Sequence, residues 1–288
     1  MELDQALVEL VRRTSTSLPR DVEAALVAGM KNEREGSSAR NAMQTIIENI
    51  RLARKKGTPI CQDTGTPIFY VRMPVGVAEK LITETIRRSI KKATKLAYLR
   101  PNSVCPITGK NPGDNTGNGF PVIHFHQWKK GSLRFDLLLK GGGSENVGIQ
   151  YKLPDARLGA GRDLDGVRKA VLDAVVQAGG KGCSPGALAV VVGGDRSSSY
   201  SLSKELFLKK LSERNPDPVL AKLEKELLAD ANSLDIGPMG LGGKTTLLDV
   251  KLASLHRVPA SFFVTVSYGC WAVRRRSMTY SDGNARFT

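Results

Sequence analysis

Three of the four cysteines lie in turn-forming segments, each beside a strand-like run. Cys61 begins the segment CQDTG, Cys183 lies within KGCSPG, and Cys270 lies within SYGCW. A cysteine that only fills a core normally sits inside an apolar run, whereas glycine and proline beside a thiol leave room for a bulky group and expose N–H donors. Such surroundings suit an iron–sulfur cluster, whose charge is tuned by hydrogen bonds to its sulfur atoms. From spacing alone, three unrelated loop thiols are the competing interpretation.

The number of thiolate ligands determines what such a cluster does. A cluster held by three cysteines leaves one iron open, and an open metal position is what a Lewis-acid catalyst requires. Cys105, in the segment SVCPI, is the fourth cysteine of the chain. As a fourth ligand it would favour electron transfer, and otherwise it is an ordinary loop thiol.

Two glycine-rich loops are candidates for binding an anion. Lys140–Asn146 reads KGGGSEN, and consecutive glycines let backbone N–H groups converge on one anion. The alternative is a tight turn that needs a positive φ. Gly237–Thr246 reads GPMGLGGKTT and resembles a phosphate loop, but Pro238 stands where that motif requires its first glycine.

The hydrophobic pattern predicts the elements that position these loops. Strands alternate with helices, so the fold class is α/β, or mixed α+β, with a helical N-terminal region (residues 1–57) packed on the alternating domain. No repeat or linker interrupts the chain, so we expect a single domain over residues 1–288 that contains all four cysteines, whether or not three of them hold a cluster. Strand patterns cover Ile68–Val71, Val122–Phe125, Leu133–Leu139, Ala187–Val192, Leu247–Leu252 and Ser261–Val266, and helical patterns cover Val77–Leu99, Asp165–Ala178 and, as two helices, Ser203–Ala231.

The excess of basic residues suggests another kind of function, which is binding to a polyanion rather than catalysis. The 288 residues include 43 Lys and Arg against 28 Asp and Glu, a net charge of +15. Such a charge suits a polyanion, so a basic nucleic-acid-binding protein with incidental cysteines is an alternative. Arg274–Arg276 would then form a nucleic-acid patch, although a solvated tail is the more common use of such a run. Only 6% of the residues are aromatic, which offers few stacking platforms for bases.

The hydropathy pattern predicts the cellular compartment of the protein. No apolar run approaches the roughly 18 residues that a membrane-spanning helix needs. The first residues are acidic and then amphipathic, unlike a secretory signal. We therefore expect a cytoplasmic protein with reduced cysteines and no membrane association. The low aromatic content argues against a nucleic-acid partner.

Taken together, the motifs resemble one known family. CQDTGTPIFYV (from Cys61), GKNPGDNTGNG (from Gly109), KGGGSEN, KGCSPG, GPMGLGGKTT and the strand before Cys270 follow one another as in the class I fumarases. These are iron–sulfur hydro-lyases, and L(+)-tartrate dehydratase is a close relative. The resemblance runs to about Arg275 and covers the N-terminal part of the single-chain enzymes. It implies an α subunit that works with a separate β subunit, in an α2β2-type assembly.

The resemblance also assigns roles to individual residues. It implies a [4Fe–4S] cluster on Cys61, Cys183 and Cys270, and reversible hydration of fumarate to L-malate, with L(+)-tartrate dehydration as the alternative. Asp63 is then the candidate for handling the proton of the leaving hydroxyl. The base that removes the carbon-bound proton belongs to the β subunit, and Cys105 has no role. The predicted substrate-binding residues are Gln62, Arg100, Gly142, Gly143 and His256.

Overall fold

The computed structural model describes residues 1–288 as two compact units, each made of helices and strands. The first unit comprises Met1–Pro19, Glu48–Gly142 and Ala272–Thr288, and the second comprises Arg20–Ile47 and Gly143–Trp271. Because neither unit is one continuous stretch, no linker marks a boundary in the sequence. The single integrated domain expected over residues 1–288 stays a prediction.

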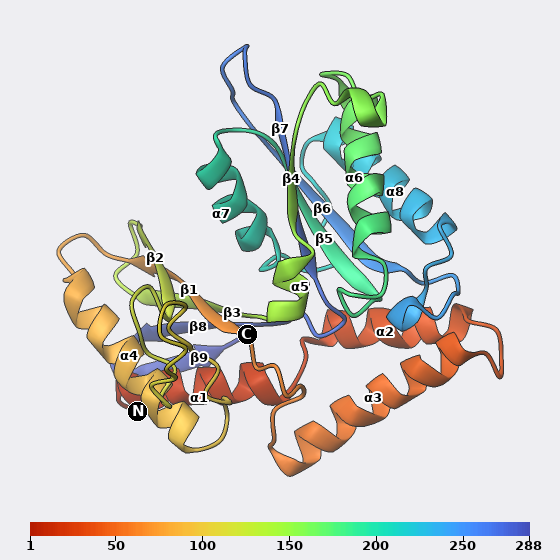
Figure 1. The fold of residues 1–288 in the computed structure, drawn as a ribbon. Helices are drawn as coiled ribbons and strands as arrows, with labels where there is room; N and C mark the ends of the chain where they lie inside the picture. Colours follow the sequence, from red (N-terminus) through yellow and green to blue (C-terminus); the bar gives the residue numbers. More distant parts are fainter. The chain divides into compact units, whose positions relative to one another are not determined.

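The first unit is built on a five-stranded sheet in the order β2-β1-β3-β8-β9 (Figure 1). β1 and β2 are parallel, and the other neighbouring strands are antiparallel. Helices α1 (Leu3–Thr16) and α4 (Glu79–Lys95) cover one face of this sheet. The strands are β1 (Thr66–Met73), β2 (Val122–Gln127), β3 (Leu133–Lys140), β8 (Arg274–Ser281) and β9 (Asn284–Phe287).

The core of the first unit follows the two periodicities of its sequence. Alternate residues of β1, such as Phe69 and Val71, point to the covered face. Ile82, Ile86 and Ile90 recur on α4 at helical spacing and pack against them. The beginning of β1 and the end of β3, where the predicted site residues cluster, are thereby fixed on a rigid sheet.

The interpretation of the C-terminal arginines as a solvated tail or a nucleic-acid patch is wrong. Arg274, Arg275 and Arg276 form the beginning of β8, which pairs with β3. The Arg274 and Arg275 side chains are buried, and Arg276 donates a hydrogen bond to the Ser17 hydroxyl at 3.0 Å. The arginine run hid the strand because its pattern is charged rather than apolar.

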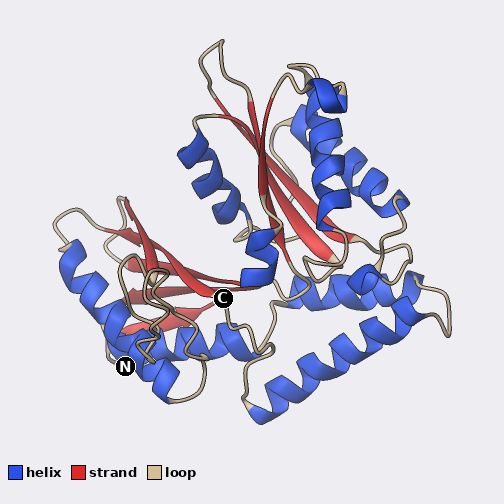
Figure 2. Ribbon diagram, in the orientation of Figure 1, coloured by secondary structure: helices blue, strands red, loops and turns tan.

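The second unit has a four-stranded sheet in the order β4-β7-β5-β6 between two layers of helices (Figure 2). β5 and β6 are parallel, and the other pairs are antiparallel. Helices α6 and α8 lie on one face of this sheet and α7 on the other. The elements are α5 (Gly142–Asn146), β4 (Ile149–Lys152), α6 (Leu164–Ala178), β5 (Gly186–Gly193), α7 (Arg196–Leu206), α8 (Pro218–Ser233), β6 (Leu247–Leu255) and β7 (Phe263–Gly269).

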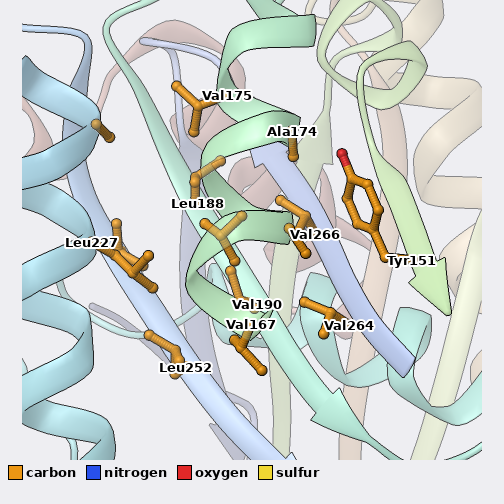
Figure 3. Close-up of a cluster of buried hydrophobic side chains, with 14 of the residues drawn as sticks. Tyr151, Val167, Ala174, Val175, Leu188, Val190, Leu227, Leu252, Val264 and Val266 are labelled. Carbon is orange, nitrogen blue, oxygen red and sulfur yellow. The ribbon is translucent and has the colours of Figure 1, made fainter. Parts of the chain in front are cut away.

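The main core of the second unit lies between its sheet and α6 (Figure 3). Asp163 caps α6 by accepting a hydrogen bond from the Gly166 N–H at 2.7 Å. Val167, Val171 and Val175 then recur at helical spacing and are buried against β5 and β7. This packing holds the two strands whose ends carry Cys183 and Cys270.

The predicted mixed fold class is confirmed, with N-terminal helices and two mixed sheets. The helical N-terminal region consists of α1, α2 (Arg20–Asn32) and α3 (Ser38–Lys56). Each predicted strand is present, while β8 and the short strands β4 and β9 were not predicted. None of the helices is long and apolar enough to cross a membrane.

A buried ion pair ties β6 to the segment between α7 and α8. The Lys251 ammonium lies 2.9 Å from the Asp249 carboxylate and donates to the carbonyls of Leu211 and Glu213. Burial raises the pKa of Asp249 to about 6, although Lys251 and the Val250 N–H act in the opposite direction. The carboxylate of Glu224, which accepts the Leu252 N–H, raises this pKa slightly further.

This pKa predicts a pH dependence of stability. The folded state binds the Asp249 proton more tightly than the unfolded state does, because the folded pKa lies above the ordinary value of 3.8. The resulting stabilisation is present below pH 3.8 and is lost as the pH rises through about 6, by up to about 3 kcal/mol. Denaturant unfolding between pH 4 and 7 should show this decline in the native chain and lose it in Asp249→Asn. Asp165→Asn, at an exposed carboxylate, is the control and should keep the decline; an unchanged slope in Asp249→Asn would contradict the assignment.

Candidate functional site

A pocket of about 370 Å³ in the first unit groups four of the predicted site residues. Gln62, Asp63, Arg100 and Gly142 all line it. They come from the loop before β1, the segment after α4 and the end of β3. The remaining lining residues are Gly65, Thr66, Asn102 and Phe120.

Asp63 is held by backbone groups on both sides of this pocket. Its Oδ1 accepts a hydrogen bond from the Gly65 N–H at 2.9 Å, and its Oδ2 accepts one from the Gly142 N–H at 2.7 Å. The Asp63 carbonyl in turn accepts a hydrogen bond from Arg274 Nη1 at 2.8 Å. The carboxylate therefore has a defined orientation, and each of its oxygens retains further acceptor capacity.

Gly65 allows the loop after Cys61 to lie directly against the end of β3. Its φ is +81°, and a Cβ atom there would lie 2.7 Å from the Lys140 carbonyl. No side chain fits at that distance, and L-residues rarely adopt this φ. The close approach brings the Asp63 carboxylate to the Gly142 N–H.

The segment that carries Arg100 is fixed by buried amide and hydroxyl groups. The Arg100 N–H donates to Thr64 Oγ1 at 3.2 Å, and its carbonyl accepts from Asn115 Nδ2 at 2.8 Å. Asn102 Nδ2 also donates to Thr64 Oγ1. The backbone is thus pinned while the Arg100 side chain is exposed at the pocket. The sequence analysis missed Asn102 and Asn115, although both lie in the Asn- and Gly-rich run before β2.

The glycine run at the end of β3 begins a short helix. Gly141, Gly142 and Gly143 all lack a positive φ, so the interpretation as a left-handed tight turn is wrong. The Gly142 N–H is already bonded to Asp63. Gly143 is exposed and belongs to the second unit.

In the second unit, the segments of Cys183 and Cys270 are direct neighbours. The Trp271 N–H donates to the Cys183 carbonyl at 3.1 Å, and both cysteines are half-buried. Cys183 has a φ of +56°, which places it at a sharp turn before β5. Two of the three predicted cluster ligands therefore come together within one compact unit.

Tyr268, which the sequence analysis did not single out, lies at the centre of these two segments. Its side chain is 2% exposed, and its hydroxyl has no hydrogen-bond partner. Burial raises the pKa of the Tyr268 phenol, and the nearby Cys270 and Cys183 thiols raise it further. A lone tyrosine in an otherwise ordinary strand carries no local signal of such a position.

The loop Gly237–Thr246 packs on the turn that contains Cys183. Ser184 Oγ donates to the Gly237 carbonyl at 2.7 Å, and the Met239 N–H donates to the Ser184 carbonyl at 2.9 Å. At the far end of the loop, the buried Glu33 carboxylate accepts the N–H groups of Lys244 and Thr245. This loop frames a cysteine turn, and its backbone donors are used inside the protein. Glu33 lies more than 200 residues before the loop, so no sequence spacing could reveal it.

The other predicted residues are placed separately. Cys61 is half-buried in the first unit, next to the pocket-lining Gln62. His256 is exposed, directly after β6, in the second unit. Cys105 is exposed in the first unit, where hydrogen bonds from Thr108 and Ile107 lower its pKa.

The structure does not itself show the predicted metal centre. Three or more His, Cys, Asp or Glu side chains arranged around one metal position are not found in it. The donor chemistry nevertheless fits an iron–sulfur group. A backbone hydrogen bond joins the segments of Cys183 and Cys270, and the Tyr268 hydroxyl between Ser267 and Gly269 is buried without a partner.

Comparison with known proteins gives a consistent set of similarities. Residues 4–279 match the family described as "Fumarate hydratase (Fumerase)". A Geobacillus stearothermophilus protein named "Putative fumarate hydratase class I" is 49% identical over 277 residues, which make up 95% of this chain and 54% of that protein. The "Putative L(+)-tartrate dehydratase subunit alpha" of Methanocaldococcus jannaschii is 37% identical over 282 residues, 96% of each chain. The L(+)-tartrate dehydratase subunit alpha of Escherichia coli K12 is 29% identical over 284 residues, 96% of this chain and 90% of that subunit. The chain thus spans about half the length of the first relative.

The bonds of Asp63 predict a measurable change in backbone protection. Asp63→Ala removes the acceptor of two N–H groups, and hydrogen bonds to charged groups contribute about 1.5–3 kcal/mol each. The amides of Gly65 and Gly142 should exchange with deuterated solvent about tenfold faster or more. Gln62→Ala, which shortens a neighbouring pocket-lining side chain, is the control and should leave both rates unchanged. Equal rates in Asp63→Ala and the native chain would contradict the bonding described here.

Proposed function

The chain belongs to the fumarate hydratase (fumerase) family, and from this premise we propose that it is the α subunit of an iron–sulfur hydro-lyase that interconverts fumarate and L-malate. The observation that carries the proposal is the pocket of the first unit. It is lined by the arginine Arg100, the carboxylate residue Asp63 and the carboxamide residue Gln62, and the last two directly follow Cys61 in the chain. A four-carbon dicarboxylate needs groups of this kind.

We propose Cys61, Cys183 and Cys270 as the ligands of a [4Fe–4S] cluster. When bound, such a cluster supplies an iron with an open position, a Lewis acid that can polarise a carbon–oxygen bond. Cys183 and Cys270 lie in segments of the second unit that a backbone hydrogen bond joins, and Cys61 precedes the pocket-lining Gln62 in the first unit. The glycine-rich loop at 237–246 supports the turn of Cys183, so this ligand is held by a rigid frame.

The charge of the first unit supports binding of a dianion. This unit carries 23 Lys and Arg against 10 Asp and Glu, whereas the second carries 20 against 18. The net charges are therefore +13 and +2. A positive field raises the local concentration of an anionic substrate, and Arg100 offers a planar guanidinium to one carboxylate. Gly143 and His256 remain our candidates for contacts to the other carboxylate, together with Gly142, whose N–H in this structure is bonded to Asp63.

We propose that Asp63 transfers the proton of the hydroxyl group that leaves the substrate. Its two backbone hydrogen bonds fix the carboxylate at the pocket without using all of its lone pairs. A carboxylate held in this way can accept or return a proton at a defined point. The base for the carbon-bound proton is assigned to a β subunit, in an α2β2-type assembly, because two of the relatives are named α subunits.

L(+)-tartrate dehydration is the second candidate reaction. It is supported by the two tartrate dehydratase α subunits, which match this chain over 90% or more of their own length. Fumarate hydration is supported by the higher identity to the fumarate hydratase relative, 49% against 37%. Both substrates are four-carbon dicarboxylates and need similar anchoring groups.

The cluster assignment predicts the outcome of single cysteine substitutions. Cys61→Ser, Cys183→Ser and Cys270→Ser should each lose the cluster, because each removes one of the three thiolate ligands. The measurements are iron and sulfide content and the absorption near 400 nm of anaerobically reconstituted protein, with about four irons expected per native chain. Cys105→Ser is the matched control and should retain the cluster. Loss of the cluster in Cys105→Ser would overturn the three-ligand scheme.

The subunit assignment predicts a dependence on a second chain. The reconstituted chain alone should show no hydration activity, because the base for the carbon-bound proton is on the β subunit. Adding the β subunit should restore turnover, measured anaerobically with fumarate, malate and both tartrate enantiomers. Turnover of fumarate above that of either tartrate would support our first assignment. Full activity of the chain alone would refute the two-subunit proposal.

A further inference from the structure

The hydroxyl of Tyr268 is a buried polar group without a hydrogen-bond partner. The side chain is 2% exposed, so bulk water does not supply the missing hydrogen bond. Burying a hydroxyl without a partner costs free energy, and most buried polar atoms are therefore bonded. Packing alone does not require the oxygen, because phenylalanine would supply the same ring.

The ring of Tyr268 is enclosed by the turn that carries Cys183. A Cβ atom added at Gly182 would lie 2.6 Å from the ring, and one at Gly186 would lie 2.5 Å from the hydroxyl oxygen. Both positions lack side chains, so the backbone on either side of Cys183 closes directly around the phenol. Tyr268 itself lies two residues before Cys270, at the end of β7. The hydroxyl therefore lies against the segment that carries Cys183, on the strand that leads directly to Cys270.

We propose that the Tyr268 hydroxyl donates a hydrogen bond to a sulfur atom of the iron–sulfur site that Cys183 and Cys270 help to form. This inference rests on the cluster assigned under the proposed function. Tyr268 is a positioning residue in this scheme, since it acts on the sulfur atoms and not on the substrate. The Tyr268 side chain is buried and is not among the residues that line the pocket.

Sulfur is the acceptor that best fits this hydroxyl. Thiolate and sulfide sulfurs carry the negative charge of an iron–sulfur site, and hydrogen bonds to them tune its reduction potential. A donor stabilises the more negative, reduced state, so it raises the potential. Hydrogen bonds to charged groups are also the stronger ones, which compensates for the burial of the phenol.

The test compares Tyr268→Phe with the native chain after anaerobic reconstitution with iron and sulfide. The variant keeps the ring and removes only the oxygen. We expect the ratio of reduced to oxidised cluster at a fixed potential to fall about tenfold, a shift of about 59 mV for a one-electron couple. In deuterated buffer, the pulsed electron paramagnetic resonance signal of one exchangeable deuteron near the cluster should disappear.

Tyr151→Phe is the matched control. Tyr151 belongs to the same core, but its hydroxyl donates to Asp173 at 2.6 Å. Its loss should leave both the potential and the exchangeable deuteron unchanged. Without metal, Tyr268→Phe should melt at the same temperature as the native chain or higher, whereas Tyr151→Phe should melt lower.

The outcomes separate this inference from the proposed function. A native chain that takes up no cluster would overturn both. A native chain that takes up the cluster, with the same potential and the same deuteron signal in Tyr268→Phe, would overturn the role of Tyr268 alone. A lower melting temperature of metal-free Tyr268→Phe would also contradict it, since the hydroxyl would then have a structural partner.

Discussion

The first unit depends on the way in which Asp63 is bonded to three segments of the chain. Its carbonyl accepts from Arg274 on β8, and its carboxylate accepts from Gly65 in its own loop and from Gly142 after β3. These bonds join residues that are far apart in sequence into one pocket wall. Hydrogen bonds that involve a charged group are about twice as strong as neutral ones. The carboxylate that we propose as catalytic can therefore be a structural anchor as well, because each oxygen has more than one lone pair.

The second unit positions its cysteines through backbone groups. The Cys183 carbonyl accepts the Trp271 N–H, and the Ser184 carbonyl accepts the Met239 N–H. Glu33 holds the other end of the same loop. These contacts fix the main chain that carries the two cysteines. They also explain why the loop at 237–246 resembles a phosphate loop in sequence: both need glycines for close backbone approach, but here the donors are satisfied within the protein.

The sequence allowed prediction of the elements that follow hydrophobic periodicity, and of the site residues that lie in glycine-rich motifs. It predicted β1, α4 and α6, together with the loop that contains Gln62 and Asp63. It did not predict β8, because buried arginines interrupt the apolar pattern of that strand. Tyr268 and Glu33 were also beyond its reach. Their importance comes from contacts with distant segments, and neither side chain is unusual for its own local pattern.

The net charge of +15 is distributed unevenly between the two units. Almost all of it belongs to the first unit, where the candidate substrate pocket lies. Arg274 and Arg275 contribute to that number but are buried in β8, so they cannot form a contact surface for a polyanion. Buried arginines still add to the field at a nearby pocket, because low-dielectric surroundings screen them less than water does. A basic composition can thus serve a small dianionic ligand, and two of its cations belong to the core rather than to an exposed cationic surface.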